Sequence, residues 1–308
     1  MGEIWIYSEE PAVAAQLLVP GKKLVQGTAQ SIRVILTDKS AAHELIRRGA
    51  DKVHVFDTQD GRPESCAPVL AEMIQAEKPT AVLFGGTLRG KEVAARCAAL
   101  VGAGLVTDAL DIRMNSGSVE TDRMVYGGLA VATELLTEPA LIGISPLSYQ
   151  APEEDGSRDG DVIIEEVAAS SGIVIQEICP IVREGADLAN ADKIVCIGRG
   201  IAKQEDIDMF SKLAELMDAE VGCTRALADS QWLSHEVYLG ISGVKAKPSL
   251  YLAFGVSGQV QHLSGIRDSK TIVAVDINEN APIFAAADYG IVGDLYEVAP
   301  LLIEALQK

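Results

Sequence analysis

The chain has 308 residues, of which 48% are apolar and 23% charged, a composition typical of a globular protein with a sizeable core and more than one domain. Acidic residues outnumber basic residues by 44 to 26, so the formal net charge is -18 and the surface should repel nucleic-acid phosphates and anionic lipid headgroups. The five cysteines include no CxxC pair, which disfavours a disulfide framework and a zinc site.

The N-terminal segment runs into an alternating apolar pattern without the basic flank and apolar block of a signal peptide. The longest clean apolar run, residues 97–106, is about half of the ~20 residues that a membrane-spanning helix needs. We therefore expect a cytoplasmic protein with no nucleic-acid partner and no direct membrane insertion.

In the first half of the chain, short β-branched runs alternate with segments of helical period, which is the pattern of a parallel sheet covered by helices. Strands are expected at residues 4–7, 33–36, 52–56 and 81–84, with helices near residues 40–48, 68–75 and 90–99. From residue 105 to 137 the pattern changes to polar alternation, which favours antiparallel or edge strands, and a further strand is expected at residues 140–144.

The second half of the chain begins with polar connecting segments. Residues 151–161 have the composition of an acidic surface loop, and residues 185–192 are interpreted as the domain boundary because a new series of strands and helices follows. Strands are expected at 193–197, 250–254 and 271–275, and helices at 204–218 and 296–306. The sequence thus predicts an α/β fold with two domains, residues 1–190 and 191–308, each a mainly parallel sheet flanked by helices.

Two glycine-rich turns follow predicted strands of the second domain. The first, Gly198-Arg199-Gly200, could bring backbone amides close to a phosphate, but a tight turn without a ligand explains it equally well. The dinucleotide-binding fingerprint would need a glycine at position 203, which is a lysine, so a standard NAD site is disfavoured.

The second turn is richer in polar groups. It begins at Gly255, and Ser257 and Gly258 can offer a hydroxyl and backbone amides to a pyrophosphate. Gln261 and His262 follow in the first turn of the next expected helix. These neighbours make His262 a better candidate for a functional histidine than the other three in the chain.

The segment 248–295, which contains LYLAFGVSGQVQHLSGIRDSKTIVAV and APIFAAADYGIVGDL, closely resembles the C-terminal signature of electron-transfer flavoprotein α subunits. The resemblance continues through VGCTRALAD and YLGISGVKAKP, and through RGKEVAARCAALVGAGLVTDA and MVYGGLA in the first half, so it covers essentially the whole chain. The run WLSHEVYLGIS resembles the bacterial branch associated with acyl-CoA or carnitine metabolism.

This resemblance implies that FAD lies extended across the C-terminal domain, which would have Rossmann-like layering. Arg225 matches the position whose guanidinium lies against the isoalloxazine ring, Ser242 a hydroxyl that bonds flavin N5, and His262 the donor to the pyrimidine carbonyl O2. The positions matched to FAD contacts are Arg199, Thr224, Arg225, Leu239, Gly240, Ile241, Ser242, Ser257, Gly258, Gln259, Val260, Gln261, His262, Asp276, Asp294 and Leu295, of which the last three would hold the adenosine half.

The chemistry of an electron carrier explains these residue types. Reduction places negative charge on the N1/C2 region of the ring, so a donor from His262 and the fixed charge of Arg225 would raise the reduction potential. Two positions depart from the family pattern: Asp276 stands where the family commonly has Asn, and Ile241 replaces a polar residue found in some relatives. An electron carrier requires no catalytic residue and no metal, and the sequence indicates neither.

The resemblance also implies partners. The chain would pair with a β subunit that binds AMP or a second FAD, domain 1–190 would be a scaffold contacting that subunit, and an acyl-CoA dehydrogenase-type flavoenzyme would exchange electrons with the pair. The FAD domain would swing about residues 185–192. The turn 85–90 looks like a nucleotide loop, but the resemblance assigns it to the scaffold.

Two alternatives remain open at this point. The chain could be the α subunit of a flavin-based electron-bifurcating complex that oxidises NADH at a β-bound FAD. It could also be a nucleotide-binding module of similar fold without redox function, although Arg225, Ser242 and His262 together argue against that.

Overall fold

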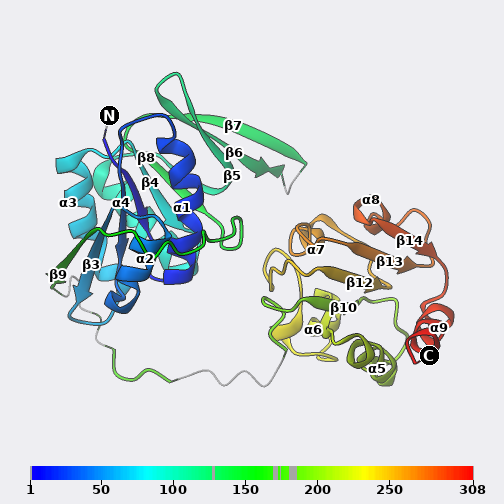
Figure 1. Ribbon diagram of the computed structural model, residues 1–308. Helices are drawn as coiled ribbons and strands as arrows, with labels where there is room; N and C mark the ends of the chain where they lie inside the picture. The colour runs from blue at the N-terminus through cyan, green and yellow to red at the C-terminus, as the bar shows by residue number, and fades with distance from the viewer. Residues whose placement is uncertain (1, 127–128, 169–172, 174, 180–185, 308) are drawn as a thin grey trace. The chain divides into compact units, whose positions relative to one another are not determined.

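The computed structural model describes residues 2–126, 129–168, 173, 175–179 and 186–307. They form two compact units, Met1–Ile178 and Cys179–Lys308, and each contains a sheet flanked by helices (Figure 1). The predicted two-domain α/β architecture is confirmed. The boundary at residues 190/191 stays a prediction, and Gly185, within the predicted connector, lies outside the described residues.

The first unit is built on a nine-stranded sheet with the strand order β7-β6-β5-β8-β4-β1-β2-β3-β9. From β5 to β9 in this order, every two neighbouring strands are parallel. The pairs β5–β6 and β6–β7 are antiparallel, as the polar alternation predicted. The strands are β1 Ile4–Tyr7, β2 Ile32–Leu36, β3 Lys52–Thr58, β4 Ala81–Gly85, β5 Leu105–Asn115, β6 Ser118–Val125, β7 Ala130–Leu136, β8 Ala140–Ile144 and β9 Asp161–Val167.

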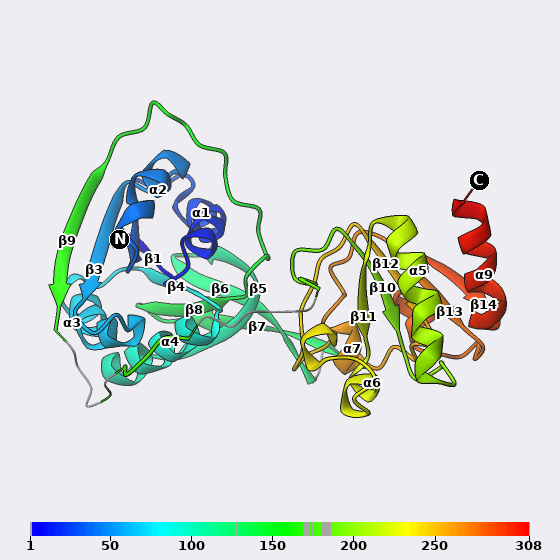
Figure 2. The ribbon, with the colours of Figure 1, turned by 90° about the horizontal axis from the view of Figure 1, so that it is seen from below.

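Helices cover both faces of this sheet, and the alternation of side chains along β1 shows why both faces must be covered. Ile4 and Ile6 point into a core with α1 and α2, while Trp5 and Tyr7 point into a second core with α3 and α4 (Figures 1 and 2). A strand that is apolar on both sides is stable only between two helical layers. The helices are α1 Pro11–Val25, α2 Ala42–Arg48, α3 Ala67–Glu77 and α4 Leu88–Val101.

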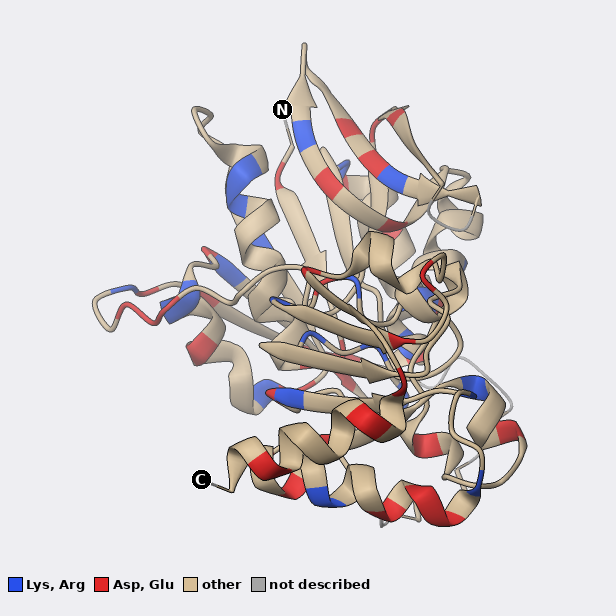
Figure 3. Cartoon of the chain, turned by 90° about the vertical axis from the view of Figure 1, so that its right-hand side faces the viewer, with Lys and Arg blue, Asp and Glu red and all other residues tan. Residues whose placement is uncertain are grey.

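The antiparallel strands β5 to β7 carry charged side chains in complementary pairs. Arg113 on β5 bonds Asp122 on β6 with an N–O distance of 2.6 Å, and Arg123 on β6 bonds Glu134 on β7 at 3.1 Å. Figure 3 shows both signs of charge side by side on these strands. Opposite charges on neighbouring strands stabilise the pairing and help to fix its register.

The second unit has a five-stranded, fully parallel sheet with the order β11-β10-β12-β13-β14. Helices α5 and α9 pack against each other, and the short helices α6, α7 and α8 follow β11, β12 and β13. The bounds are β10 Lys193–Ile197, α5 Ile207–Met217, β11 Glu220–Cys223, α6 Arg225–Asp229, β12 Leu250–Phe254, α7 Val260–Leu263, β13 Ile272–Asp276, α8 Ile283–Ala286, β14 Tyr289–Val292 and α9 Leu295–Leu306. Across the described part of the chain, no helix is long and apolar enough to cross a bilayer.

Candidate functional site

A pocket of about 550 Å³ lies at the carboxyl ends of the strands of the second unit. From β10 the chain passes first to β11 on one side and later to β12 on the other, so the loops after these strands diverge. Parallel α/β sheets bind ligands at such a switch point. The lining residues are Arg199, Gly200, Thr224, Arg225, Ala226, Tyr238, Leu239, Gly240, Ile241, Ser242, Gly255, Val256, Ser257, Gly258, Gln259, Gln261, His262 and Asp276.

All the predicted cofactor-contact residues except three line this pocket. Val260 is the first residue of α7, and Asp294 caps α9 by accepting a 2.8 Å hydrogen bond on Oδ1 from the Tyr296 amide. Leu295 is buried, and its side chain packs beside Gly200 and Gly255. The fold thus gathers residues that lie up to 77 positions apart, from Arg199 to Asp276, around one cavity.

The two glycine-rich turns fit together through their backbones. The Gly200 amide donates a 3.1 Å hydrogen bond to the Gly255 carbonyl, and a side chain on either residue would collide with the other. Gly255 and Gly258 have φ angles of +60° and +77°, a region that favours glycine. A Cβ at Gly258 would also meet the backbone of Ile283. These glycines therefore shape the floor of the pocket.

Ser242 reaches the pocket with its hydroxyl orientation already defined. The Tyr238 hydroxyl donates a 2.8 Å hydrogen bond to Ser242 Oγ, and Tyr238 itself is 9% exposed. Because one lone pair of Oγ accepts from the tyrosine, the Ser242 O–H remains available as a donor to a ligand. Tyr238 was not among the predicted site residues.

His262 is buried against the pocket wall with its two ring nitrogens in different surroundings. Nε2 lies 2.7 Å from the Tyr251 hydroxyl, whereas Nδ1 is buried and has no hydrogen-bond partner in the described structure. Burial lowers the pKa of His262 to about 4, so the ring is neutral at pH 7. An orphaned buried nitrogen at a cavity wall is a site for a ligand group.

Two guanidinium groups give the pocket positive charge in a chain of net charge -18. Arg225 is exposed, and its Nε lies 3.3 Å from Asp229 Oδ2 one helical turn away. Arg199 forms no ion pair with any residue that the structure describes. The buried hydroxyl of Thr224 is also without a partner there. Together these groups suit an anionic, phosphate-bearing ligand.

Comparison with known proteins identifies the family. A family model described as the electron transfer flavoprotein domain matches residues 11–170, and one described as the electron transfer flavoprotein FAD-binding domain matches residues 187–267. This chain belongs to the electron transfer flavoprotein family, as an α subunit. The predicted resemblance is confirmed, and FAD is the cofactor of the matched domain family.

Full-length relatives agree with this assignment. The chain is 37% identical to the electron transfer flavoprotein subunit alpha of Bacillus subtilis, over 93% of this chain and 90% of the relative. It is 33% identical to protein FixB of Salmonella typhimurium and 34% identical to protein FixB of Escherichia coli O139:H28, in both cases over 99% of this chain and 98% of the relative.

The residues of this electron transfer flavoprotein fit FAD. Thr224 and His262, whose Oγ1 and Nδ1 atoms are buried without a hydrogen-bond partner among the described residues, both line a cavity whose size lies within the range of about 300 to 1,000 Å³ for cofactor sites. Asp276, the departure from the family pattern, ends β13, and its Oδ1 accepts a 2.9 Å hydrogen bond from the Asn278 amide. Its other carboxylate oxygen remains available to accept from a ribose hydroxyl. Among the described residues, no cluster of side chains suits a metal ion.

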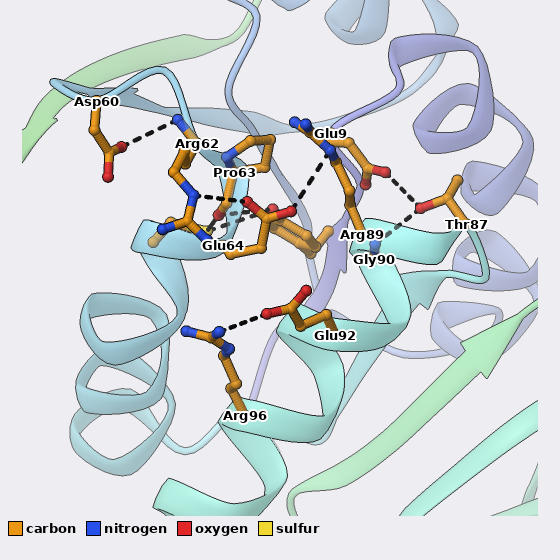
Figure 4. A network of polar contacts seen from close by, with 12 residues as sticks. Glu9, Asp60, Arg62, Pro63, Glu64, Thr87, Arg89, Gly90, Glu92 and Arg96 are labelled. Carbon is orange, nitrogen blue, oxygen red and sulfur yellow. Dashed lines mark hydrogen bonds and ion pairs between the residues drawn. The ribbon is translucent and has the colours of Figure 1, made fainter. Parts of the chain in front are cut away.

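The turn 85–90 in the first unit has a different character (Figure 4). Thr87 Oγ1 accepts a 2.8 Å hydrogen bond from the Gly90 amide and donates one of 2.5 Å to Glu9. Arg89 faces the buried Glu64 at 3.5 Å. The polar groups of the turn therefore bond to one another and to neighbouring side chains. The carboxylates beside the turn would also repel a phosphate. Both observations support the interpretation of this turn as part of a scaffold.

The sequence analysis missed two tyrosines that organise the site, Tyr238 and Tyr251. Each makes a hydrogen bond to a residue predicted to contact FAD; Tyr238 itself lines the pocket, and Tyr251 lies outside the lining. A signal for Tyr251 exists, because it is the one residue with a polar group in the otherwise apolar strand β12, and a buried tyrosine hydroxyl needs a partner.

Proposed function

We propose that this chain is the FAD-carrying subunit of a heterodimeric electron transfer flavoprotein. Its FAD accepts electrons from acyl-CoA dehydrogenase-type flavoenzymes and passes them to a downstream acceptor, or delivers them to an acyl-CoA reductase or dehydrogenase. The observation that carries the proposal is the convergence of Arg225, Ser242 and His262 on one cavity at the switch point of a parallel sheet. The chain itself is an electron carrier and not an enzyme.

The bound FAD supplies electron transfer at its isoalloxazine ring. In the proposed arrangement, Ser242 donates its hydroxyl hydrogen toward N5, held in place by Tyr238. His262 donates from Nδ1 toward the carbonyl O2, and Arg225 provides fixed positive charge beside the ring. A donor or cation that binds more strongly when the ring becomes negative favours the reduced forms, and so raises the reduction potential.

The remaining predicted contacts hold the rest of the cofactor. Arg199 and Thr224 bind from the first two loops, and the turn 255–262 cradles the pyrophosphate. Asp276, Asp294 and Leu295 hold the adenosine half. Leu295 serves this role through the glycine turns that it packs against.

The partner is an electron transfer flavoprotein β subunit that binds AMP or a second FAD, and the first unit is its docking scaffold. The edge strand β7 supports this proposal. Its outer face carries Val131 and Leu135, 59% and 64% exposed, and Leu129 just before the strand is 80% exposed. An apolar stripe on an unpaired sheet edge is otherwise an aggregation hazard, so a dedicated partner explains it.

Co-expression with the β subunit tests the proposal. We expect a 1:1 heterodimer that retains one FAD in the second unit of this chain, and reduction of that FAD by an acyl-CoA dehydrogenase and its substrate in the cytoplasmic fraction of the host. A monodisperse, FAD-saturated species that contains only this chain would contradict the heterodimer. Direct reduction by NADH would instead support the bifurcating alternative.

A further inference from the structure

The buried hydroxyl of Tyr251 contacts the far side of the His262 ring. Tyr251 is the second residue of β12 and is fully buried, and its hydroxyl oxygen is 2.7 Å from His262 Nε2. The ring centroids are 6.2 Å apart and the planes are tilted by 47°, so the two rings do not stack face to face. Tyr251 does not line the FAD pocket.

The other ring nitrogen, Nδ1, belongs to a residue that lines the pocket. Nδ1 is buried and makes no hydrogen bond to a described residue. The backbone carbonyl of Leu239 lies by the ring and favours a proton on it. Since Nε2 faces the tyrosine, a bare lone pair on Nδ1 would oppose the carbonyl dipole, whereas an N–H would be attracted to it.

Both partners are neutral at pH 7. Burial lowers the pKa of His262 to about 4 and raises the pKa of Tyr251 well above its usual value. A neutral imidazole carries a single N–H, so the two ring nitrogens have opposite roles and the partner of one decides the role of the other. The buried thiol of Cys196 lies beside the Tyr251 hydroxyl, and a thiol can donate weakly to the phenol oxygen.

We propose that Tyr251 donates its hydroxyl hydrogen to Nε2 of His262 and so fixes the single imidazole proton on Nδ1, as a permanent donor into the FAD pocket. Tyr251 is therefore a positioning residue that acts through His262. This inference rests on the proposed function, in which the Nδ1–H meets the flavin carbonyl O2. It makes His262 a hydrogen-bond donor of fixed direction that holds its proton and does not transfer it.

The test uses the heterodimer with FAD, labelled with [15N]histidine, and reads the tautomer from the 15N chemical shifts of the two ring nitrogens. The chain has four histidines, so a His262→Gln variant assigns the signal. The variant under test is Tyr251→Phe. Tyr7→Phe is the matched control, because Tyr7 is also fully buried in a central strand with its hydroxyl beside a thiol, that of Cys66.

We expect a protonated Nδ1 and a bare Nε2 in the wild type. In Tyr251→Phe the ratio of the Nδ1–H to the Nε2–H tautomer should fall about fivefold, the equivalent of one lost hydrogen bond, and the reduction potential of the bound FAD should fall with it. Tyr7→Phe should change neither quantity. A general loss of packing would not move the tautomer ratio.

An Nε2–H tautomer in the wild type, or an unchanged ratio in folded Tyr251→Phe, overturns the inference. If Tyr251→Phe fails to fold, the wild-type spectrum alone decides, because it reports which nitrogen carries the proton. A heterodimer without FAD that still shows the Nδ1–H tautomer would refute the proposed function while leaving the role of Tyr251 intact.

Discussion

The hydroxyl of Tyr238 donates a 2.8 Å hydrogen bond to Oγ of Ser242, and both residues line the FAD pocket. The serine hydrogen is thereby directed away from Tyr238 and is available to a ligand in the pocket. We predict that Ser242→Ala lowers the potential of the first one-electron reduction by the equivalent of about 1 kcal/mol, because a donor at the unprotonated N5 is worth more once one electron has made the ring negative. Tyr238→Phe should have a smaller effect in the same direction. Spectroelectrochemical titration of the three proteins measures this order, and equal potentials would contradict it.

His262 and Arg225 should both raise the reduction potential, by different means. His262→Ala removes a neutral donor and Arg225→Ala removes a fixed charge. We expect each to lower the potential by the equivalent of about 1 to 3 kcal/mol while FAD remains bound. The effect of Arg225 should weaken at high salt because its side chain is 69% exposed, whereas the effect of the buried His262 should not. Unchanged potentials in both variants would refute these roles.

Burial of His262 predicts a pH dependence of stability. Its pKa is about 4 in the folded protein and about 6.5 in an unfolded chain, so the unfolded state binds more protons below pH 6.5. The contribution of the neutral His262 ring to the free energy of unfolding is therefore fully present above pH 6.5. This contribution, about 3 kcal/mol in total, is lost as the pH falls toward 4. Denaturant unfolding at pH 7.5 and 4.5 measures this loss. His262→Gln should unfold with a visibly flatter pH dependence, and parallel curves for the two proteins would argue against the assignment.

The connector to the second unit offers a test of domain motion. We predict that Ala186→Pro slows electron transfer from the cognate dehydrogenase while leaving FAD content and potential unchanged, because a stiffer connector limits the docking poses of the swinging FAD domain. The Ala186 amide donates no hydrogen bond to a described residue, so proline costs none. Position 189 is unsuitable, because it is the third residue of a turn closed by the Asn190 amide and the Asp187 carbonyl at 3.2 Å.

Stopped-flow reduction measures the transfer rate, and a fluorophore pair across the two units reports whether the motion is restricted. Leu188→Ala is a useful contrast. Leu188 is 1% exposed within the core of the second unit, so its truncation should cost about 2 to 5 kcal/mol of stability without stiffening the connector. Wild-type transfer rates in a demonstrably immobilised variant would show that the swinging-domain mechanism is wrong.

The apolar edge of β7 predicts where the β subunit binds. Leu135→Glu should weaken the heterodimer about tenfold or more, because it buries a charge in the proposed interface. Ile164→Glu is the matched control on the opposite edge strand, β9, where Ile164 is 58% exposed. Analytical ultracentrifugation of both heterodimers gives the two affinities. A loss of affinity only in Ile164→Glu would show that the β subunit binds at the β9 edge of the sheet and not at the β7 edge.

Sequence reasoning found the strands whose side chains are apolar without interruption. The observed bounds of β1, β8, β10 and β12 coincide with the expected ones. It missed α1, which contains Pro20 and a glycine in mid-helix, since tertiary packing outweighs their low helix propensity.

Strands β9, β11 and β14 and two residues of the site were also missed. β9 is an edge strand with several charged residues and only one fully buried side chain, so its sequence resembles the acidic loop before it. The predicted FAD-contact residues came from a family resemblance, which implies direct contacts only. Tyr238 and Tyr251 are hydrogen-bonded to partners 4 and 11 residues away, and only the folded geometry shows those pairings.

The chain leaves the first unit through β9, which gives this strand a mechanical role. β9 runs parallel to β3 through seven register pairs, from Lys52 with Asp161 to Thr58 with Val167, and His54 bonds Glu165 across the pair at 2.8 Å. A pull on the carboxyl end of β9 acts along the strand, so it loads all of these hydrogen bonds in shear at once instead of opening them one by one. If the FAD domain moves as proposed, its connector would be anchored in the geometry that best resists extension.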